Sequence, residues 1–441
     1  MVTGHWSLSR RDRERWRTTA VQGAALTPQR FDENSRLGGC GGSRTEWRGS
    51  TYSAMKLLVF AHVPPPHHGQ SQMVQYLVDG FRARPDLGID VVHVDARLSG
   101  DLQDVGSARG GKVFQLLKYC GQALSARFRS GVRTLYYIPS PPKRTPLIRD
   151  WMVFLLLRPW FRDVVFHWEA AGLGEWLESQ ARPWERWLSR RLLGKPALSV
   201  VLAETNRRDA EVLSSRQTRV VHNALKDPCP DFDRTLGPRR RARIQELRET
   251  GGDVRVLFLA LCSRDKGLFD AMEAVARANA SAAARTSGCT LRFRLTVAGA
   301  FPDPDLEREF REWCAQPGRA GMVTHAGFLS GADKDAAWRA ADVFLFPTYY
   351  ANEGQPVSLI EAMAYGVPAV TTRWRGIPEM LPSGYAGLVE PRDSTAQSEA
   401  LLAVALGEGG FELRREYERR FTLDRYLEGM ASAIRGIAER S

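Results

Sequence analysis

The sequence has few cysteines and does not arrange them in pairs. Six cysteines are spread over 441 residues, and none of them forms a Cys-x-x-Cys pair or a cluster with histidine. This spacing argues against a zinc site and against a disulfide framework. We therefore expect a reducing, cytoplasmic setting.

Long apolar runs are also missing. The apolar stretch at residues 151–157 (WMVFLLL) is far shorter than the ~20 residues that span a bilayer, and we expect it to be a buried helix. Residues 182–191 (RPWERWLSRR) mix tryptophan with arginine. They leave two alternatives open: an ordinary helix, or a face in peripheral contact with an anionic membrane.

Residues 1–54 lack any sustained apolar periodicity. They contain the charged run RRDRERWR at 10–17 and the glycine-rich run GGCGG at 38–42, and they have no apolar stretch of the kind found in signal peptides. The next segment, MKLLVFA, reads as a first buried strand that begins at an initiator methionine, Met55. We expect residues 1–54 to be a disordered or misassigned leader; a regulatory arm is the alternative.

The chain is basic, with 62 Lys and Arg against 50 Asp and Glu and a net charge of +12. Basic proteins of this size often bind nucleic acid, but no nucleic-acid module accompanies the charge here, so we expect no nucleic-acid partner. Anionic ligands and anionic membrane lipids explain the excess equally well.

Strand-like and helical stretches alternate along the rest of the chain, which predicts βαβ units and parallel sheets. The expected strands are 55–62, 88–94, 133–138, 164–168, 198–203 and 220–222, followed by 254–261, 291–299, 323–328, 341–347, 368–372 and 387–391. A segment rich in proline and arginine separates the two sets. We predict an α/β fold with a first domain at 55–228, a linker with a short helix at 229–253, a second domain at 254–410 and C-terminal helices at 411–441.

Residues 353–366 (EGQPVSLIEAMAYG) carry the strongest functional pattern. Two carboxylates, Glu353 and Glu361, stand eight residues apart, and a Gly354-Gln355-Pro356 turn precedes the helix that carries the second. A glycine and a first-turn proline favour a helix start whose free amides suit anionic or hydroxyl-rich groups. Each glutamate alone would be read as a solvated helix residue. The combination predicts a site at the carboxyl end of a strand, where open α/β sheets bind ligands.

Two further strand ends carry candidate residues. Arg264 and Lys266 follow the strand at 254–261 and precede Gly267 and a helix, where fixed positive charges suit a diphosphate. Gly69 follows the strand at 55–62 at the start of another helix, although one glycine is a weak phosphate-loop signal. His167 ends the strand at 164–168; taken alone, it reads as a buried histidine.

These motifs resemble glycosyltransferase family 4, the retaining nucleotide-sugar glycosyltransferases with the GT-B fold of two Rossmann-like domains. The resemblance is strongest over 254–391 and extends to residue 55. It implies that Glu353, Gly354 and Gln355 meet the transferred sugar, that Glu361 binds the nucleotide ribose and that Pro356 belongs to the donor-binding residues. Arg264 and Lys266 would bind the diphosphate, and His167 would face the sugar from the other domain. Gln70, Ala224, Ala260 and Cys262 depart from the residues usual in the family.

The resemblance implies transfer of a hexose-type sugar from a nucleoside diphosphate sugar to a hydroxyl of a cell-envelope glycan or lipid-linked saccharide. Glu353, His167, Arg264 and Lys266 are the expected catalytic residues, and Gly69 joins the donor-binding set. No cofactor and no metal are expected, because no Asp-x-Asp cluster stands in a suitable place. Two alternatives remain: a nucleotide-sugar epimerase of the same fold, and a basic membrane-surface binding protein.

Overall fold

The computed structural model describes residues 54–65, 69–97, 109–281, 285–286 and 289–437. Apart from Ala54, the predicted leader therefore lies outside the described residues. The described residues belong to one compact unit. The predicted boundaries at 228, 253 and 410 consequently remain predictions.

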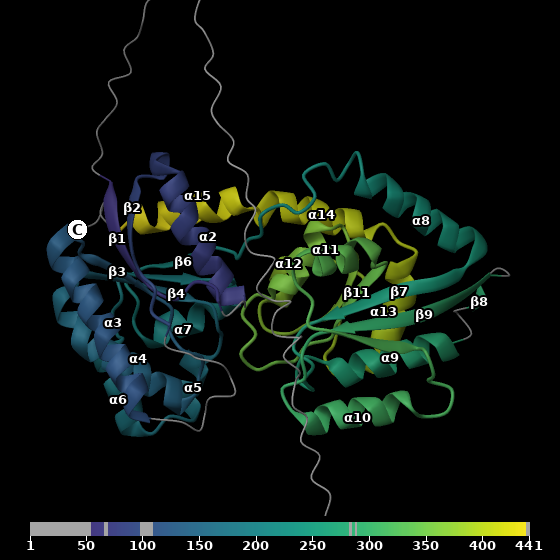
Figure 1. Ribbon diagram of the computed structural model, residues 1–441, viewed down its shortest axis with the longest axis horizontal. Coiled ribbons are helices and arrows are strands. Elements are labelled where there is room, and N and C mark those ends of the chain that lie inside the picture. The colour runs from purple at the N-terminus through teal and green to yellow at the C-terminus, as the bar shows by residue number, and fades with distance from the viewer. Residues whose placement is uncertain (1–53, 66–68, 98–108, 282–284, 287–288, 438–441) are drawn as a thin grey trace, which may run out of the picture. The chain divides into compact units, whose positions relative to one another are not determined.

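The first sheet is parallel and has six strands in the order β2-β1-β3-β4-β5-β6 (Figure 1). Its strands are β1 (Met55–Phe60), β2 (Ile89–Val94), β3 (Thr134–Tyr137), β4 (Asp163–Trp168), β5 (Leu198–Val201) and β6 (Thr218–Val220). Its helices are α2 (Gly69–Ala83), α3 (Arg109–Ser130), α4 (Arg144–Leu157), α5 (Leu173–Ser179), α6 (Pro183–Leu192) and α7 (Arg207–Val212). The prediction of a strand at 220–222 was wrong by two residues, because β6 ends at Val220.

Alternating side chains of the first sheet build two separate cores. Leu58 and Phe60 of β1 pack with α3 and α4 on one face, whereas Leu57 and Val59 pack with α2 on the other. This is the period-two alternation of a strand that is buried on both faces. The predicted helix at 151–157 is the second half of α4 and contributes Phe154 to the first of these cores.

The second sheet has the order β10-β9-β7-β11-β12-β13, and its pairs are parallel except that the short β8 runs antiparallel to β9. The strands are β7 (Gly252–Leu259), β8 (Arg285–Thr286), β9 (Cys289–Ala298), β10 (Val323–Gly327), β11 (Val343–Phe346), β12 (Ala369–Thr372) and β13 (Leu388–Val389). The helices are α8 (Leu236–Thr250), α9 (Leu268–Ala280), α10 (Pro304–Cys314), α11 (Gly331–Ala340), α12 (Val357–Ala364), α13 (Ser394–Ala405) and α14 (Gly409–Arg420). Two parallel sheets with flanking helices confirm the predicted α/β fold class.

The last helix, α15 (Leu423–Arg435), packs against the first sheet rather than the second. Its buried side chains include Leu427 and Met430, which share a core with Leu77 of α2. In Figure 1, α15 lies beside α2. We call the first sheet with α2–α7 and α15 the first lobe, and the second sheet with α8–α14 the second lobe.

Candidate functional site

Glu353 lies in the loop between β11 and α12 and is 6% exposed. Its Oε2 atom accepts a hydrogen bond from the Nζ of Lys266 at 2.7 Å and another from the Oγ1 of Thr348 at 3.0 Å. A buried carboxylate requires such partners, because its desolvation would otherwise be costly. The structure thus brings two of the predicted site residues into direct contact at the carboxyl ends of β7 and β11.

Lys266 is held from several sides. Its Nζ lies 4.5 Å from the ring centroid of Tyr350 and 5.7 Å from that of Phe346, in cation–π geometry. The next residue, Gly267, has φ of +79°, and a methyl group there would overlap the carbonyl oxygen of Pro347. This close approach fixes the Lys266 loop against the end of β11, so a glycine is required there.

The turn after Glu353 contacts the first lobe. The backbone at Gly354 approaches Glu169 so closely that a methyl group added to Gly354 would overlap the Glu169 carbonyl oxygen. The Oε1 of Gln355 accepts a hydrogen bond from the backbone N–H of Asn223 at 2.6 Å. Pro356 is the N-cap residue of α12. The backbone N–H groups of Gly354 and Gln355 form no hydrogen bond to another residue in the described part of the chain, so they are free to meet a ligand.

Glu361, on α12, has two partners from α11. Its Oε1 accepts from the Nζ of Lys334 at 2.7 Å, and its Oε2 accepts from the indole N–H of Trp338 at 3.2 Å. Sequence reasoning missed both partners. Their spacing of four residues, which places them on one face of a helix, was the available signal.

Arg264 lies apart from the Lys266–Glu353 pair. Its guanidinium forms an ion pair with Glu309 of α10 and lies 4.8 Å from the ring centroid of Phe269. It lines a cavity of about 300 Å³ together with Phe269 and Tyr349. Because its side chain is more than half exposed, the guanidinium has room to change partner.

Gly69 begins α2, and a methyl group on it would lie 3.1 Å from the Cγ2 of Val357, the first residue of α12. The structure therefore brings the amino ends of two helices, one from each lobe, next to each other. The positive ends of both helix dipoles favour an anion at this place.

His167 lies on the first-lobe side and is fully buried. Its Nδ1 is hydrogen bonded to the hydroxyl of Tyr136 at 2.6 Å, and its ring lies against Tyr426 of α15. Burial lowers the pKa of His167 to about 3, so the ring is neutral. The structure does not bring His167 into contact with Glu353.

Glu169, two residues beyond His167, was missed by sequence reasoning. Burial raises its pKa to about 7, while a hydrogen bond from the Nδ2 of Asn223 at 3.1 Å acts in the opposite direction. Its Oε1 is buried without a hydrogen bond among the described residues. A buried carboxyl with a raised pKa next to a candidate site is a common feature of functional sites. The sequence signal was a glutamate directly after a strand.

A second contact between the lobes involves Glu379. Its carboxylate accepts hydrogen bonds from the backbone N–H groups of Glu204 and Thr205, at 2.7 and 2.9 Å. The short helix of Glu204–Asn206 in the first lobe is thus capped by a side chain of the second lobe.

Comparisons with known proteins identify the motif-bearing lobe. Residues 253–405 match the family described as Glycosyl transferases group 1. WcaL of Salmonella typhimurium (strain LT2), a glycosyltransferase named for colanic acid biosynthesis, is 30% identical over 36% of this chain and 37% of its own length. AmsK of Erwinia amylovora, an amylovoran biosynthesis glycosyltransferase, is 31% identical over 35% of this chain and 37% of its own. The matched part of the chain spans little more than a third of the length of these relatives.

The fold comparison covers far more of the chain. Sucrose-phosphate synthase from Thermosynechococcus elongatus superimposes with a TM-score of 0.61 and 18% identity, over 88% of this chain and all of that one. At 18% identity this likeness shows the fold alone, and it extends over both lobes of this chain. The chain therefore has the GT-B fold, and its residues 253–405 belong to the family described as Glycosyl transferases group 1.

Proposed function

We propose that the protein transfers a sugar from a nucleoside diphosphate sugar to a hydroxyl acceptor, with retention of configuration. The observation that carries the proposal is the 2.7 Å contact between Lys266 and Glu353 at the amino end of α12, with Glu361 on the same helix. Lys266, Glu353 and Glu361 thus lie where one donor molecule can contact each of them through its phosphates, its sugar and its ribose.

In this proposal Lys266 neutralises the departing diphosphate. The bond between the anomeric carbon and the phosphate oxygen breaks with its electron pair going to the phosphate. The acceptor oxygen bonds to that carbon from the same face and gives its proton to the leaving phosphate. A fixed positive charge stabilises the charge that develops on the phosphate. Without donor, Glu353 compensates the charge of Lys266.

Glu353 and Glu361 are assigned to different parts of the donor. Glu353 and the free N–H groups of Gly354 and Gln355 would orient the sugar, and Glu361 would accept both ribose hydroxyls. Lys334 and Trp338 hold the Glu361 carboxylate in place before the donor arrives. Arg264 would exchange Glu309 for the diphosphate, which the amino ends of α2 and α12 would also attract.

The acceptor is proposed to be a cell-envelope glycan or a lipid-linked saccharide; the relatives WcaL and AmsK, which are named for colanic acid and amylovoran biosynthesis, support a glycan acceptor. We place the protein in the cytoplasm, in peripheral contact with the inner face of an anionic membrane. No helix in the described ranges has the length and apolar character needed to cross a bilayer.

A surface of the first lobe supports the membrane contact. Phe114 on α3, Leu155 on α4 and Trp187 on α6 are each more than 60% exposed. These three helices form a continuous row, since α4 packs against both α3 and α6. The exposed apolar side chains of this row and of the short turn Arg158–Trp160 after α4, which we call the apolar face, are Val113, Phe114, Leu117, Phe128, Ile148, Leu155, Trp160, Trp184 and Trp187. Arginines flank them, as in interfacial helices.

A thermal-shift screen of nucleoside diphosphate sugars tests the donor proposal, because a ligand stabilises the folded state by RT ln(1 + [L]/Kd) without any acceptor. We expect one class of nucleotide sugar to raise Tm in the wild type and to do so less in Glu361→Ala. No shift with any donor would contradict the proposal. Incubation with the stabilising donor alone separates it from an epimerase, which would isomerise the sugar without an acceptor.

The proposal includes no metal. Because positive side chains are assigned to the leaving group, transfer should survive an excess of chelator with little loss of rate. Complete inactivation that added metal reverses would contradict this assignment.

A further inference from the structure

A cavity of about 240 Å³ lies at the opposite end of the second sheet from the Lys266–Glu353 pair. It is bounded by α8, by the start of α14 and by the segments that follow α11 and α12. Its charged lining consists of Arg239, Arg240, Arg243, Arg255, Arg339 and a single carboxylate, Asp342. Asp342 directly precedes β11, whereas Glu353 follows that strand, so the two sites lie at different ends of the sheet.

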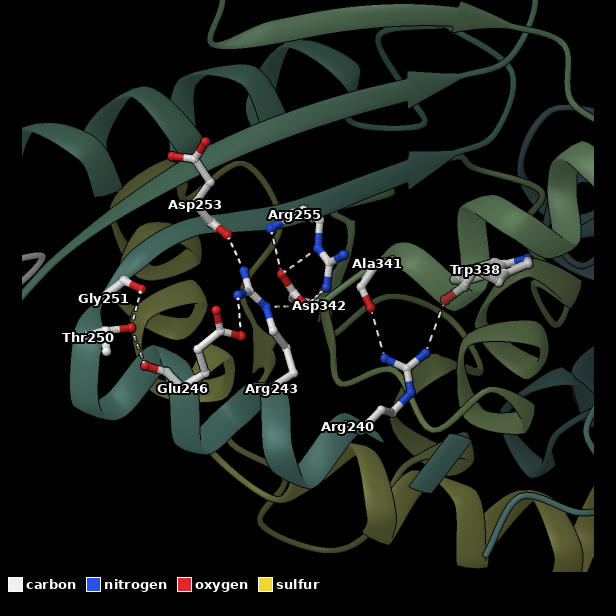
Figure 2. A network of polar contacts seen from close by, with 10 residues as sticks. All are labelled: Arg240, Arg243, Glu246, Thr250, Gly251, Asp253, Arg255, Trp338, Ala341 and Asp342. Carbon is white, nitrogen blue, oxygen red and sulfur yellow. Dashed lines mark hydrogen bonds and ion pairs between the residues drawn. The ribbon is translucent and has the colours of Figure 1, made fainter. Parts of the chain in front are cut away.

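The arginines exceed the carboxylates that pair with them. Asp342 accepts two hydrogen bonds from the Arg255 guanidinium, at 2.7 and 3.0 Å, as Figure 2 shows. Arg243 pairs with Glu246 at 2.9 Å, and Arg339 pairs with Asp335 at 2.7 Å. Arg239 and Arg240 form no ion pair with any residue that the structure describes. Five guanidinium groups thus share three carboxylates, which leaves two positive charges in excess.

Arg240 is buried and bonds to backbone carbonyls instead of a carboxylate. It donates to the carbonyl oxygens of Trp338, Ala341 and Tyr365 at 2.8 to 3.0 Å, two of which appear in Figure 2. Burial, together with the charges of Arg255 and Arg339, lowers its pKa to about 10 although Asp342 acts in the opposite direction. The groups around Arg240 therefore neutralise its positive charge only in part, and an anion bound in the cavity would neutralise the rest.

Arg243 also has a donor that makes only a long ion pair. Its Nε is buried and forms no hydrogen bond within the described part of the chain, and the nearest carboxylate oxygen, on Asp342, lies 3.5 Å away. In Figure 2 the Arg243 side chain extends from α8 toward Asp342 and the backbone of Asp253. A buried N–H group without a hydrogen bond is unfavourable unless a ligand accepts from it.

The rest of the lining completes a site for an anion with an organic part. Gly410 and Phe411, at the amino end of the twelve-residue helix α14, form one wall, where the helix dipole adds positive potential. Leu236 and Ile244 of α8 form an apolar wall. The volume equals that of about eight water molecules at about 30 Å³ each, which suits a phosphate with a small organic group.

We propose that this arginine-lined cavity binds a small phosphorylated molecule, separately from the donor site. Its phosphate accepts hydrogen bonds from the arginines, and its organic part contacts Leu236, Ile244 and Phe411. Arginine is the side chain best suited to phosphate, because its planar group donates two parallel hydrogen bonds. The proposal does not depend on the proposed transfer reaction.

Calorimetric titration of glucose 6-phosphate into the full chain, saturated with a nucleoside diphosphate to occupy the donor site, tests the proposal. We expect saturable binding that weakens with salt. The double variant Arg239→Gln/Arg339→Gln should bind at least tenfold more weakly and keep its affinity for the nucleoside diphosphate. Both side chains are exposed and neither contacts Asp342, so the variant should keep the wild-type Tm.

The matched control is Arg308→Gln/Arg311→Gln, which removes two exposed arginines from α10. Equal weakening in the control would assign the binding to net charge and overturn the proposal. No binding to the wild type, or competition by the nucleoside diphosphate, would overturn it as well. Inorganic phosphate should bind more weakly than glucose 6-phosphate; equal affinity would refute the contacts with the organic part.

Discussion

The two lobes place their apolar and charged side chains differently. Nine of the eleven large apolar side chains that are exposed in the described residues belong to the first lobe, and only Leu261 and Phe328 belong to the second. In contrast, the buried or half-buried charge pairs Lys266–Glu353 and Lys334–Glu361 lie in the second lobe. The first lobe also buries charged side chains, such as Asp150, which pairs with Arg149, so what distinguishes it from the second lobe is its apolar surface.

This difference assigns different partners to the lobes. A buried carboxylate paired with a lysine is ready to exchange that partner for a polar ligand, which is how we interpret the donor site. Exposed aromatic side chains flanked by arginines leave apolar area in contact with water, and an anionic membrane would stabilise them. The following experiments test whether each function remains with its own lobe.

The largest effect is expected for Lys266→Met, which keeps the length of the side chain and removes its charge. It should lower kcat on the order of 100-fold, because loss of one group that stabilises developing charge commonly costs that much. Steady-state kinetics with saturating donor checks this. Lys334→Met is the matched control, since Lys334 also pairs with a glutamate at 2.7 Å. It should raise the donor KM instead, and equal losses of kcat in both variants would contradict the division of roles.

Glu353→Gln should have the next largest effect. The change keeps the shape of the side chain and removes its negative charge beside the transferred sugar, so kcat should fall about tenfold for every ~1.4 kcal/mol of transition-state stabilisation lost. Glu361→Ala should mainly raise the donor KM, because ribose contacts are shared by ground and transition states. An unchanged kcat in Glu353→Gln would remove Glu353 from the reaction.

The apolar face predicts an effect on membrane binding. Phe114→Ser/Trp187→Ser should lower co-sedimentation with anionic vesicles about tenfold, since each lost ring removes on the order of 1 kcal/mol or more of burial, and salt should release the wild type. Leu261→Ser/Phe328→Ser in the second lobe should bind like the wild type. Equal binding of the wild type to neutral and anionic vesicles, or none to either, would refute the electrostatic part of the proposal.

The smallest effect concerns stability and Glu169. Its folded-state pKa of about 7 lies above the ordinary value of 4.5, so the folded state holds a proton that the unfolded state loses. Stability should therefore fall as pH rises from about 4.5 to 7 and then level off. Glu169→Gln mimics the protonated form and should raise Tm by a few degrees at pH 8 and scarcely at all at pH 4.5. A Tm difference that does not change with pH would contradict the raised pKa.

The sequence predicted the features that depend on local pattern. Continuous apolar runs located most strands to within two or three residues, because a strand buried on both faces is apolar throughout. The spacing of Glu353 and Glu361 located the loop and helix at the end of β11. Features that arise from tertiary packing were missed, including the contact of Lys334 with Glu361. The sequence does not reveal that Phe114 is exposed while Phe154 is buried, because both belong to apolar helical stretches.

Calorimetric titration of a nucleoside diphosphate into Glu353→Gln and Glu361→Ala tests the placement of the donor most directly. The ligand carries the ribose and the diphosphate but no sugar, so Glu361→Ala should bind it more weakly and Glu353→Gln should bind it like the wild type. Weaker binding in Glu353→Gln together with normal binding in Glu361→Ala would contradict the account, because the two glutamates would then have the opposite roles.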